Sequence, residues 1–299
     1  MRTITVGRGK YKTIADLPYP LPYGTRVVIR AGIYNEQLVL SSGCRYELDR
    51  DAIIDYSADN ALPTISVWGQ KIVDCYVGGG TIRRSGINGA ASIAVIGNGS
   101  SVTIESDLVG ENPCYNAAVE LNGATLNFKG SIAAKSCCIR TSAYEASNLI
   151  ADGIFSSVQD YCIWIANQYT LANVKGSIYS KGNSAICFSA GTFTIESAAI
   201  ISDGYFGLEI EGEGDVLVRN SIIESRVNGG YQVGDAVSHY VPSARLTFDN
   251  CTFKCAHPNA YSISEQGYPA RVTFASDCRG TNQVSPLIGI DGPGSLVVG

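Results

Sequence analysis

The middle of the chain repeats itself with a period of roughly 23 residues. Successive slices begin at Ser92, Ala117, Cys138, Cys162, Ala185 and Gly207. Each slice holds two short stretches in which apolar and polar residues alternate, such as Val119–Leu121 and Leu126–Phe128, with a polar turn between them. Alternation with a period of two indicates a β-strand with one buried face. A self-similar unit of this length is typical of a repeat protein, in which each unit stacks on the next.

Each repeat ends with a third short piece that is centred on one aliphatic residue, as at Ile132 and Ile178. No helical pattern separates the pieces, so the unit is not a β-α-β unit, and each strand must pair in parallel with its counterpart in the next coil. The sequence therefore predicts an all-β fold: a right-handed, single-stranded parallel β-helix, a solenoid of coils about 23 residues long. The motif of leucine-rich repeats is absent, and a β-propeller blade needs about 40 residues.

The two ends of the chain depart from the repeat, as capping segments must. We expect residues 1–25 to be an N-terminal cap segment and residues 26–299 to be the β-helix, with its first strand at Arg26–Arg30. Within the cap, Thr13–Leu17 predicts a short helix that the following Pro18 ends. Residues 228–243 interrupt the periodicity and predict a loop insertion.

Composition and charge disfavour several classes of function. The net charge is −5, and Lys and Arg do not cluster, whereas nucleic-acid binding needs a basic face. No run approaches eighteen apolar residues, so we expect no membrane insertion. The N-terminus lacks the apolar segment of a secretory signal, so we expect no signal peptide.

Cysteine is abundant, with ten residues, but no C-x-x-C pair occurs, and the chain has only two histidines. We therefore predict reduced thiols, with no metal site and no cofactor. Cys138, Cys162 and Cys187 follow one another at nearly the interval of the repeat. This recurrence predicts that the three thiols stack as a ladder of small apolar residues at one position of the coil.

The first forty residues carry a resemblance to a known family. The residues that carry it are Val6-Gly7, Gly9, Tyr11, Thr13-Ile14, Arg26–Ile29, Ala31–Tyr34 and Glu36. This opening resembles that of pectin-lyase-like β-helix proteins, which include pectin methylesterases and phage tail spikes. The resemblance implies a fold and not an activity, because that fold hosts many functions.

The active-site motifs of the enzymes in that family are absent. Gln159-Asp160 begins like a methylesterase motif, but Tyr161 and Cys162 follow instead of Thr and Leu. The motifs of polygalacturonases and pectate lyases are also missing. The sequence thus disfavours an enzyme of these families.

The outward residues of the first strand of each coil should stack into one row along the solenoid. The predicted row is Ala94, Glu120, Arg140, Trp164, Cys187 and Glu209. We predict that Glu120, Arg140, Trp164 and Glu209 contact a glycan or a partner subunit; an inert solvated surface is the alternative. An aromatic ring can stack on a sugar ring, and carboxylates can accept hydrogen bonds from its hydroxyls.

The residues that could carry catalysis are Glu209 and Glu211, although we assign no catalytic residue. Two positions apart on one strand, they would lie roughly 6.6 Å from each other, within the separation of about 5 to 9.5 Å that glycoside hydrolysis requires. Glu213 and Asp215 extend this acidic segment, which could instead be a solvated turn or a Ca²⁺ site.

Tyr115, Tyr161 and Tyr205 precede the first strands of alternate coils and predict either a contact surface or stacking at one corner.

The sequence favours a non-catalytic structural or adhesion protein over an enzyme. We expect a phage virion component, such as a tail spike, fibre or capsid-decoration subunit, that is assembled in the host cytoplasm and contacts partner subunits or surface glycans. The resemblance to tail spikes implies a homotrimer. The alternative is a polysaccharide-active lyase or glycoside hydrolase that acts on the exposed face of the solenoid.

Overall fold

The computed structural model describes residues 2–67, 69–86, 92–111, 117–228, 234–241, 243–265 and 268–299. All regular elements in these ranges are β-strands. The chain divides into two compact units, Met1–Gly153 and Ile154–Gly299, and strand β14 (Asn148–Ser157) crosses the division. Within the described ranges, no helix has the length and hydropathy that a membrane span needs.

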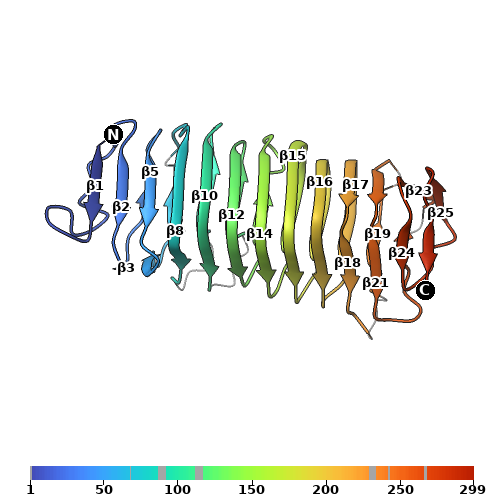
Figure 1. Ribbon diagram of the computed structural model, residues 1–299. Helices are drawn as coiled ribbons and strands as arrows, with labels where there is room; N and C mark the ends of the chain where they lie inside the picture. Colours follow the sequence, from blue (N-terminus) through green and yellow to red (C-terminus); the bar gives the residue numbers. More distant parts are fainter. Residues whose placement is uncertain are drawn as a thin grey trace. The chain divides into compact units, whose positions relative to one another are not determined.

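The first unit is a stack of parallel strands (Figure 1). Its strands are β1 (Thr3–Val6), β2 (Arg26–Ile29), β3 (Gly32–Tyr34), β4 (Leu38–Val39), β5 (Arg45–Leu48), β6 (Ala52–Asp55), β7 (Ile65–Ser66), β8 (Cys75–Arg84), β9 (Ala94–Gly97), β10 (Ser101–Gly110), β11 (Val119–Asn122), β12 (Thr125–Ala134) and β13 (Ile139–Thr141). Strand β10 pairs in parallel with β8 on one side and β12 on the other, so that Ile104 lies opposite Val77 and Phe128. All three side chains are buried, which shows that equivalent residues of successive coils fill one continuous core.

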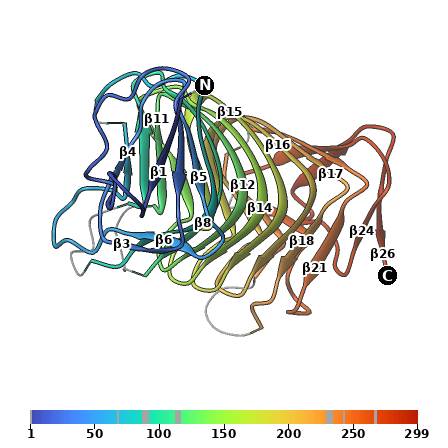
Figure 2. The same cartoon turned by 60° about the vertical axis from the view of Figure 1, so that its left-hand side comes forward.

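The second unit repeats this arrangement. Its strands are β15 (Ile163–Ser180), β16 (Ile186–Ser202), β17 (Leu208–Arg219), β18 (Ile222–Ser225), β19 (Val237–His239), β20 (Arg245–Asp249), β21 (Thr252–Cys255), β22 (Ile263–Glu265), β23 (Ala270–Phe274), β24 (Cys278–Gly280), β25 (Ile288–Asp291) and β26 (Leu296–Val298). Ile163 pairs with Ile186 and Ile186 with Leu208, which confirms the predicted length of the coil. Strands β15 and β16 each run through the predicted pieces of a repeat, and register shifts interrupt their pairing. Figure 2 shows the corresponding bends in these ribbons.

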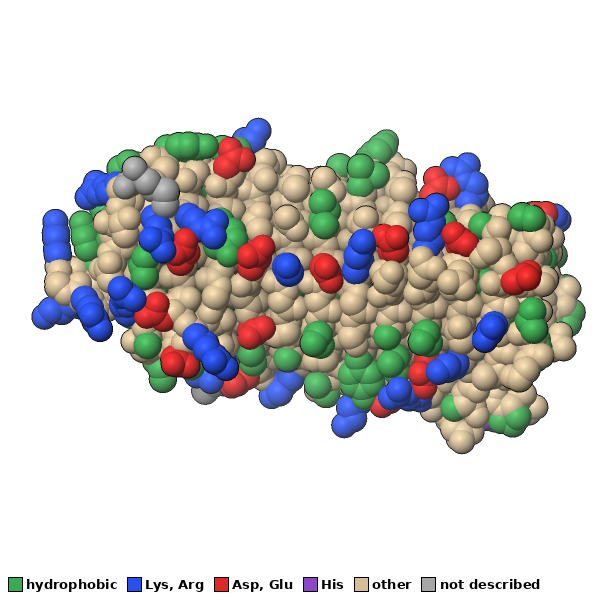
Figure 3. Space-filling view, viewed as in Figure 1, with side chains coloured by type: hydrophobic (Ala, Val, Ile, Leu, Met, Phe, Trp, Pro, Cys, Tyr) green, Lys and Arg blue, Asp and Glu red, His purple; other side chains and the backbone are tan. Residues whose placement is uncertain are grey.

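Aromatic residues fill the core toward the end of the second unit. The rings of Phe248, Phe253 and Phe274 are buried, and their centroids lie 5.1 to 6.4 Å apart. On the outside, oppositely charged side chains of neighbouring coils pair: Lys175 Nζ lies 2.9 Å from Glu196 Oε2. Figure 3 shows the same mixing of basic and acidic side chains on one face of the molecule.

The predicted helix at Thr13–Leu17 is wrong. The segment is a single turn, in which the Leu17 amide donates to the Ile14 carbonyl at 3.0 Å. The Asp16 carboxylate accepts from the amides of Lys12 and Thr13 at 2.8 and 2.9 Å. Helix nucleation fixes several residues for one hydrogen bond, and Pro18 has no amide hydrogen with which to continue, so the segment stays a turn. Its Ile14 side chain is nevertheless buried.

The first strand begins earlier than predicted. Strand β1 lies inside residues 1–25 and pairs in parallel with β2, with Ile4 opposite Val27 and Val6 opposite Ile29. All four side chains are buried, because Thr3–Val6 has the same alternation as the later strands. The ladder therefore starts at Thr3 and not at Arg26.

The predicted insertion at 228–243 contains a strand. Residues 229–233 and 242 lie outside the described residues, but Val237–His239 forms β19 and pairs with β17 and β22. Leu208 pairs with Ile186 in the preceding coil and with Val237 in the next, and the interval to Val237 is the longer of the two. The extra length lies before Val237, and the first strand of the coil is preserved.

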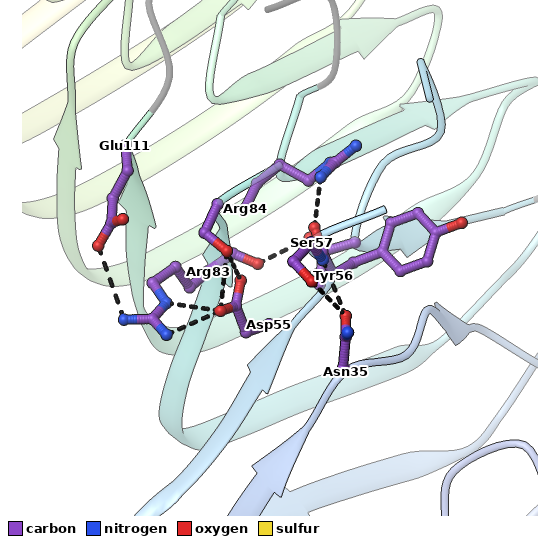
Figure 4. A network of polar contacts seen from close by, with 9 residues as sticks. Asn35, Asp55, Tyr56, Ser57, Arg83, Arg84 and Glu111 are labelled. Carbon is purple, nitrogen blue, oxygen red and sulfur yellow. Dashed lines mark hydrogen bonds and ion pairs between the residues drawn. The ribbon is translucent and has the colours of Figure 1, made fainter. Parts of the chain in front are cut away.

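A buried arginine organises a loop of the first unit. Arg84 donates hydrogen bonds to the backbone carbonyls of Tyr56, Ala58, Asn60 and Leu62. Figure 4 shows its neighbour Arg83, which donates to Asp55 Oδ2 at 2.7 and 3.0 Å. Arg84 thereby holds residues 56–62 against β8.

Candidate functional site

The outer face of the first strands in the first unit carries the predicted row with one error. Glu120 lies opposite Arg140 on one side, as predicted, and opposite Val95 on the other. Ala94 pairs with Val119, and both are buried in the core. The prediction of Ala94 in this row is therefore wrong by one position, and a shift of one residue moves a side chain to the opposite face of a strand.

A groove lies beside Glu120 and Arg140. It encloses about 220 Å³ and is lined by Glu120, Asn122, Arg140, Thr141, Ser142, Ala143 and Tyr144. The Tyr144 side chain is the most exposed large aromatic there, with 94% of its surface accessible. Ser92 Oγ donates a 2.5 Å hydrogen bond to Glu120 Oε1 and fixes this carboxylate. The groove thus combines a carboxylate, a guanidinium and an exposed ring, and Tyr144 was not among the predicted residues.

In the second unit the predicted row is confirmed in register but not in exposure. Trp164 lies opposite Cys187, and Cys187 lies opposite Glu209. Cys187 and Glu209 are buried, and Glu209 is only 7% exposed. Tyr161 and Tyr240 lie close enough to Glu209 for their hydroxyls to influence the pKa of its carboxyl. Glu209 is therefore buried on a face that the sequence predicted to be open.

Glu209 is held in an environment that favours its protonated form. Burial raises its pKa, and the nearby Glu211 carboxylate raises it further. Ser184 Oγ donates to Glu209 Oε2 at 2.6 Å, and this bond opposes the shift. A buried carboxyl that keeps its proton can serve as a general acid.

Glu211 lies on the same side of β17 but is exposed. Its Oε2 accepts from Cys187 Sγ at 3.2 Å and from Ser189 Oγ at 3.4 Å. Ser189 Oγ in turn accepts from the indole nitrogen of Trp164 at 2.9 Å. The ring of Tyr161 lies 5.6 Å from that of Trp164. The structure therefore brings Glu209 and Glu211 together with an aromatic pair.

Glu213 and Asp215 do not join this pair. Asp215 Oδ2 accepts from Arg245 at 2.7 Å, and Glu213 Oε1 accepts from Ser243 Oγ at 3.1 Å. The hydrogen bond from Arg245 lowers the pKa of Asp215. Within the described ranges, no group of three or more His, Cys, Asp or Glu side chains is arranged to hold a metal ion.

The predicted cysteine ladder is wrong in the second unit. Cys187 stacks on Trp164 and Glu209 on the outer face, whereas Cys162, directly before β15, donates its amide to the Ala185 carbonyl. The interval from Cys162 to Cys187 is longer than that from Ile163 to its partner Ile186, so the two thiols fall out of register. The nine cysteines that the structure describes are free thiols.

Tyr115 lies outside the described residues, and Tyr205 is partly exposed beside Phe206.

Sequence reasoning missed Ser184, which hydrogen-bonds to Glu209, and Tyr240, which lies near it. Ser184 lies before its strand, where the alternating pattern does not predict which way a side chain points. Tyr240 lies in the predicted insertion. The sequence signal that could have located Tyr240 is the strand Val237–His239. Ser238 of this strand pairs with Glu209, and Tyr240 follows directly after the strand.

Residues 138–284 match the family model described as the right handed beta helix region. The chain is a right-handed parallel β-helix. The matched part of the β-helix runs from β13 to β24 and confirms the fold that the repeat predicted. Searches of the curated proteins and of the solved structures found no match to this β-helix.

Proposed function

We propose that this β-helix is a non-catalytic adhesion protein that binds a surface glycan in the groove of Glu120, Arg140 and Tyr144. The observation that carries the proposal is the exposure of Tyr144 beside an oppositely charged pair in a groove of about 220 Å³. An exposed tyrosine ring offers an apolar surface with a polar tip. The adjacent carboxylate, guanidinium and amide can hydrogen-bond to sugar hydroxyls on either side of a stacked ring.

Glycan binding can be tested with Tyr144→Ala and Arg140→Gln in a glycan-array screen followed by calorimetry. We expect each substitution to weaken binding of the captured glycan at least tenfold, because each removes a contact made directly with the ligand. Tyr268→Ala removes another exposed tyrosine and is the control that should bind normally. Normal binding by both groove variants would contradict the proposal.

The adhesion role fits a phage virion component, such as a tail spike, fibre or capsid-decoration subunit. Its support is the resemblance of the opening residues and the free thiols of the nine cysteines that the structure describes, since free thiols suit a protein assembled in a reducing cytoplasm. A homotrimer is the assembly that the resemblance implies. Light scattering coupled to size-exclusion chromatography should give three times the chain mass of 31.7 kDa, and a monomer at micromolar concentration would contradict the tail-spike role.

A second candidate function is cleavage of a polysaccharide by Glu209 and Glu211. It is favoured by the buried Glu209, whose pKa is raised, next to the exposed Glu211 on the same side of β17. Glu209 would donate its proton to the leaving glycosidic oxygen, and Glu211 would activate a water or attack the anomeric carbon. It ranks second because the Glu209 side chain is only 7% exposed.

Cleavage can be tested by incubating the protein with acidic and neutral polysaccharides and measuring new reducing ends. If the second function is correct, chain shortening should occur, and Glu209→Gln and Glu211→Gln should each abolish it. Absence of shortening with the wild-type chain, or full activity in both variants, would exclude this pair.

A further inference from the structure

Two cysteines of the unit Ile154–Gly299 lie side by side on successive coils. Cys251 directly precedes β21, and Cys278 is the first residue of β24. Thr252 pairs with Arg279, so Cys251 and Cys278, each one residue earlier, are neighbours at the strand spacing of about 4.8 Å. This spacing lies within the Cα separation of about 4.4 to 6.8 Å that a disulfide spans.

The backbone holds the Cys278 sulfur against Cys251. The Cys251 amide donates a hydrogen bond to Cys278 Sγ at 3.4 Å, and the Cys251 carbonyl accepts from the Arg279 amide at 2.9 Å. Both cysteines are free thiols, and both side chains are buried. The register of the two coils therefore brings the thiols together without any movement of the strands.

The two thiols differ in acidity. The nearby Cys251 thiol and the Cys251 amide lower the pKa of Cys278, although burial opposes this shift. The pKa of Cys251 is raised, both by its Cys278 neighbour and by burial. Because the thiolate is the reactive form of cysteine, Cys278 is the member of the pair that an oxidant attacks first.

Strand β26 covers Cys278 on the side away from Cys251. Leu296 of β26 pairs with Cys278. The strand is three residues long, and the side chains of Val297 and Val298 are exposed. Short strands with few buried side chains open locally at a lower free-energy cost than the core. A small oxidant therefore reaches Cys278 when β26 detaches, whereas the closed coil keeps both thiols covered.

We propose that Cys251 and Cys278 form a disulfide in the presence of hydrogen peroxide and thereby tie β21 to β24. The Cys278 thiolate attacks one peroxide oxygen and breaks the O–O bond, which leaves a sulfenic acid on Cys278 and a hydroxide that takes up a proton. The Cys251 sulfur then attacks the Cys278 sulfur and breaks the S–O bond, and the departing hydroxide leaves as water with the Cys251 proton. The two sulfurs lose two electrons, and the peroxide is reduced to two waters.

A second cysteine pair provides an internal comparison. Arg45 pairs with Tyr76, so Cys44 and Cys75 are also neighbours on successive coils. Burial raises the pKa of both thiols, so little thiolate is present at neutral pH. We expect this pair to stay reduced at peroxide concentrations that oxidise the first pair.

The proposal can be tested by treating the reduced chain with hydrogen peroxide, alkylating it with N-ethylmaleimide in guanidinium and digesting it without reductant. Mass spectrometry should find two peptides joined through Cys251 and Cys278, and crosslinking of Cys44 to Cys75 should be at least ten times slower. Cys44→Ser should crosslink the first pair normally. Cys251→Ser should lose the crosslink and carry a sulfenic acid on Cys278, which dimedone traps during unfolding.

Hydrogen exchange tests whether the disulfide holds the coils together. The Arg279 amide, which is bonded to the Cys251 carbonyl, should exchange at least tenfold slower in the oxidised protein, and dithiothreitol should restore the faster rate. The proposal is overturned if no peptide joins Cys251 to Cys278, if Cys44 and Cys75 crosslink equally fast, or if the crosslink leaves this exchange rate unchanged. Thermal unfolding of each reduced variant checks that it is folded, and the wild-type crosslink decides the outcome if a variant is not.

Discussion

Ser184 Oγ donates a 2.6 Å hydrogen bond to Oε2 of Glu209, and both side chains are buried. The serine precedes β16 and the glutamate belongs to β17, so the bond joins two successive coils on their outer side. A serine hydroxyl can donate to a carboxylate or accept from a carboxylic acid. Glu209 therefore keeps a partner in both protonation states, and burial is what favours the protonated one.

The raised pKa of Glu209 makes stability depend on pH. The folded chain holds this proton more tightly than the unfolded chain, whose glutamates titrate near about 4.3. The contribution of Glu209 to the free energy of unfolding is therefore complete below that pH and is lost as the pH rises through the folded-state pKa. In Glu209→Gln, urea unfolding at a series of pH values should show a smaller loss of stability over this range.

The control for this measurement is Glu213→Gln, at an exposed position of the same strand. It should leave the wild-type pH dependence in place. An identical pH dependence in wild type and Glu209→Gln would show that the buried carboxyl is not the titrating group.

Gly212 allows two coils to approach each other closely. A Cβ added at this position would lie 1.4 Å from the backbone oxygen of Ser189 in the preceding coil. Because the obstacle is backbone and not a flexible side chain, the coils would have to separate. Gly212→Ala should therefore destabilise the fold by about 3 kcal/mol or more, as other overpacked sites do, measured by urea unfolding. Gly110→Ala is the matched control, since its Cβ would meet nothing closer than 3.7 Å; an equal loss in both variants would contradict the argument.

Periodicity is why the fold and much of the outer row could be predicted. The alternation within Val119–Leu121 assigns Glu120 to the outside, and a constant coil length then places Arg140 next to it. The same argument places Cys187 between Trp164 and Glu209. The argument failed at Ala94, because Ala94 faces the core and the next residue of that strand faces outward. It also failed at Cys162, because the interval from Cys162 to Cys187 is longer than one coil.

The burial of Glu209 could not be predicted, because two residues that lie near it do not follow the repeat. Tyr161 comes from the turn before β15, and Tyr240 follows the strand inside the predicted insertion. Alternation tells which side of a strand a residue occupies, but not what a turn places over it. Tyr144 was missed for the same reason, since it lies in a turn after β13.

Arg84 should be the most costly arginine to replace among those that the structure describes. Its guanidinium is fully buried and satisfies four backbone carbonyls of the 56–62 loop. Arg84→Met keeps much of the volume but leaves those carbonyls without their donor, so we expect a loss of about 3 to 5 kcal/mol in the free energy of unfolding. Arg30→Met removes an exposed ion pair with Asp49 and should cost less than about 1 kcal/mol. Equal losses would mean that the loop does not depend on Arg84.

The cysteines should be unreactive until the chain unfolds. The nine described cysteines are free, and all but Cys255 are buried. Burial raises the pKa of Cys255 to about 12, so little of its reactive thiolate is present at neutral pH. With a chromogenic disulfide reagent and no reductant, the native protein should react slowly, and at least nine thiols should titrate in concentrated guanidinium. Cys255→Ala should remove the fastest native phase, and fewer than nine thiols after unfolding would show that a disulfide had formed.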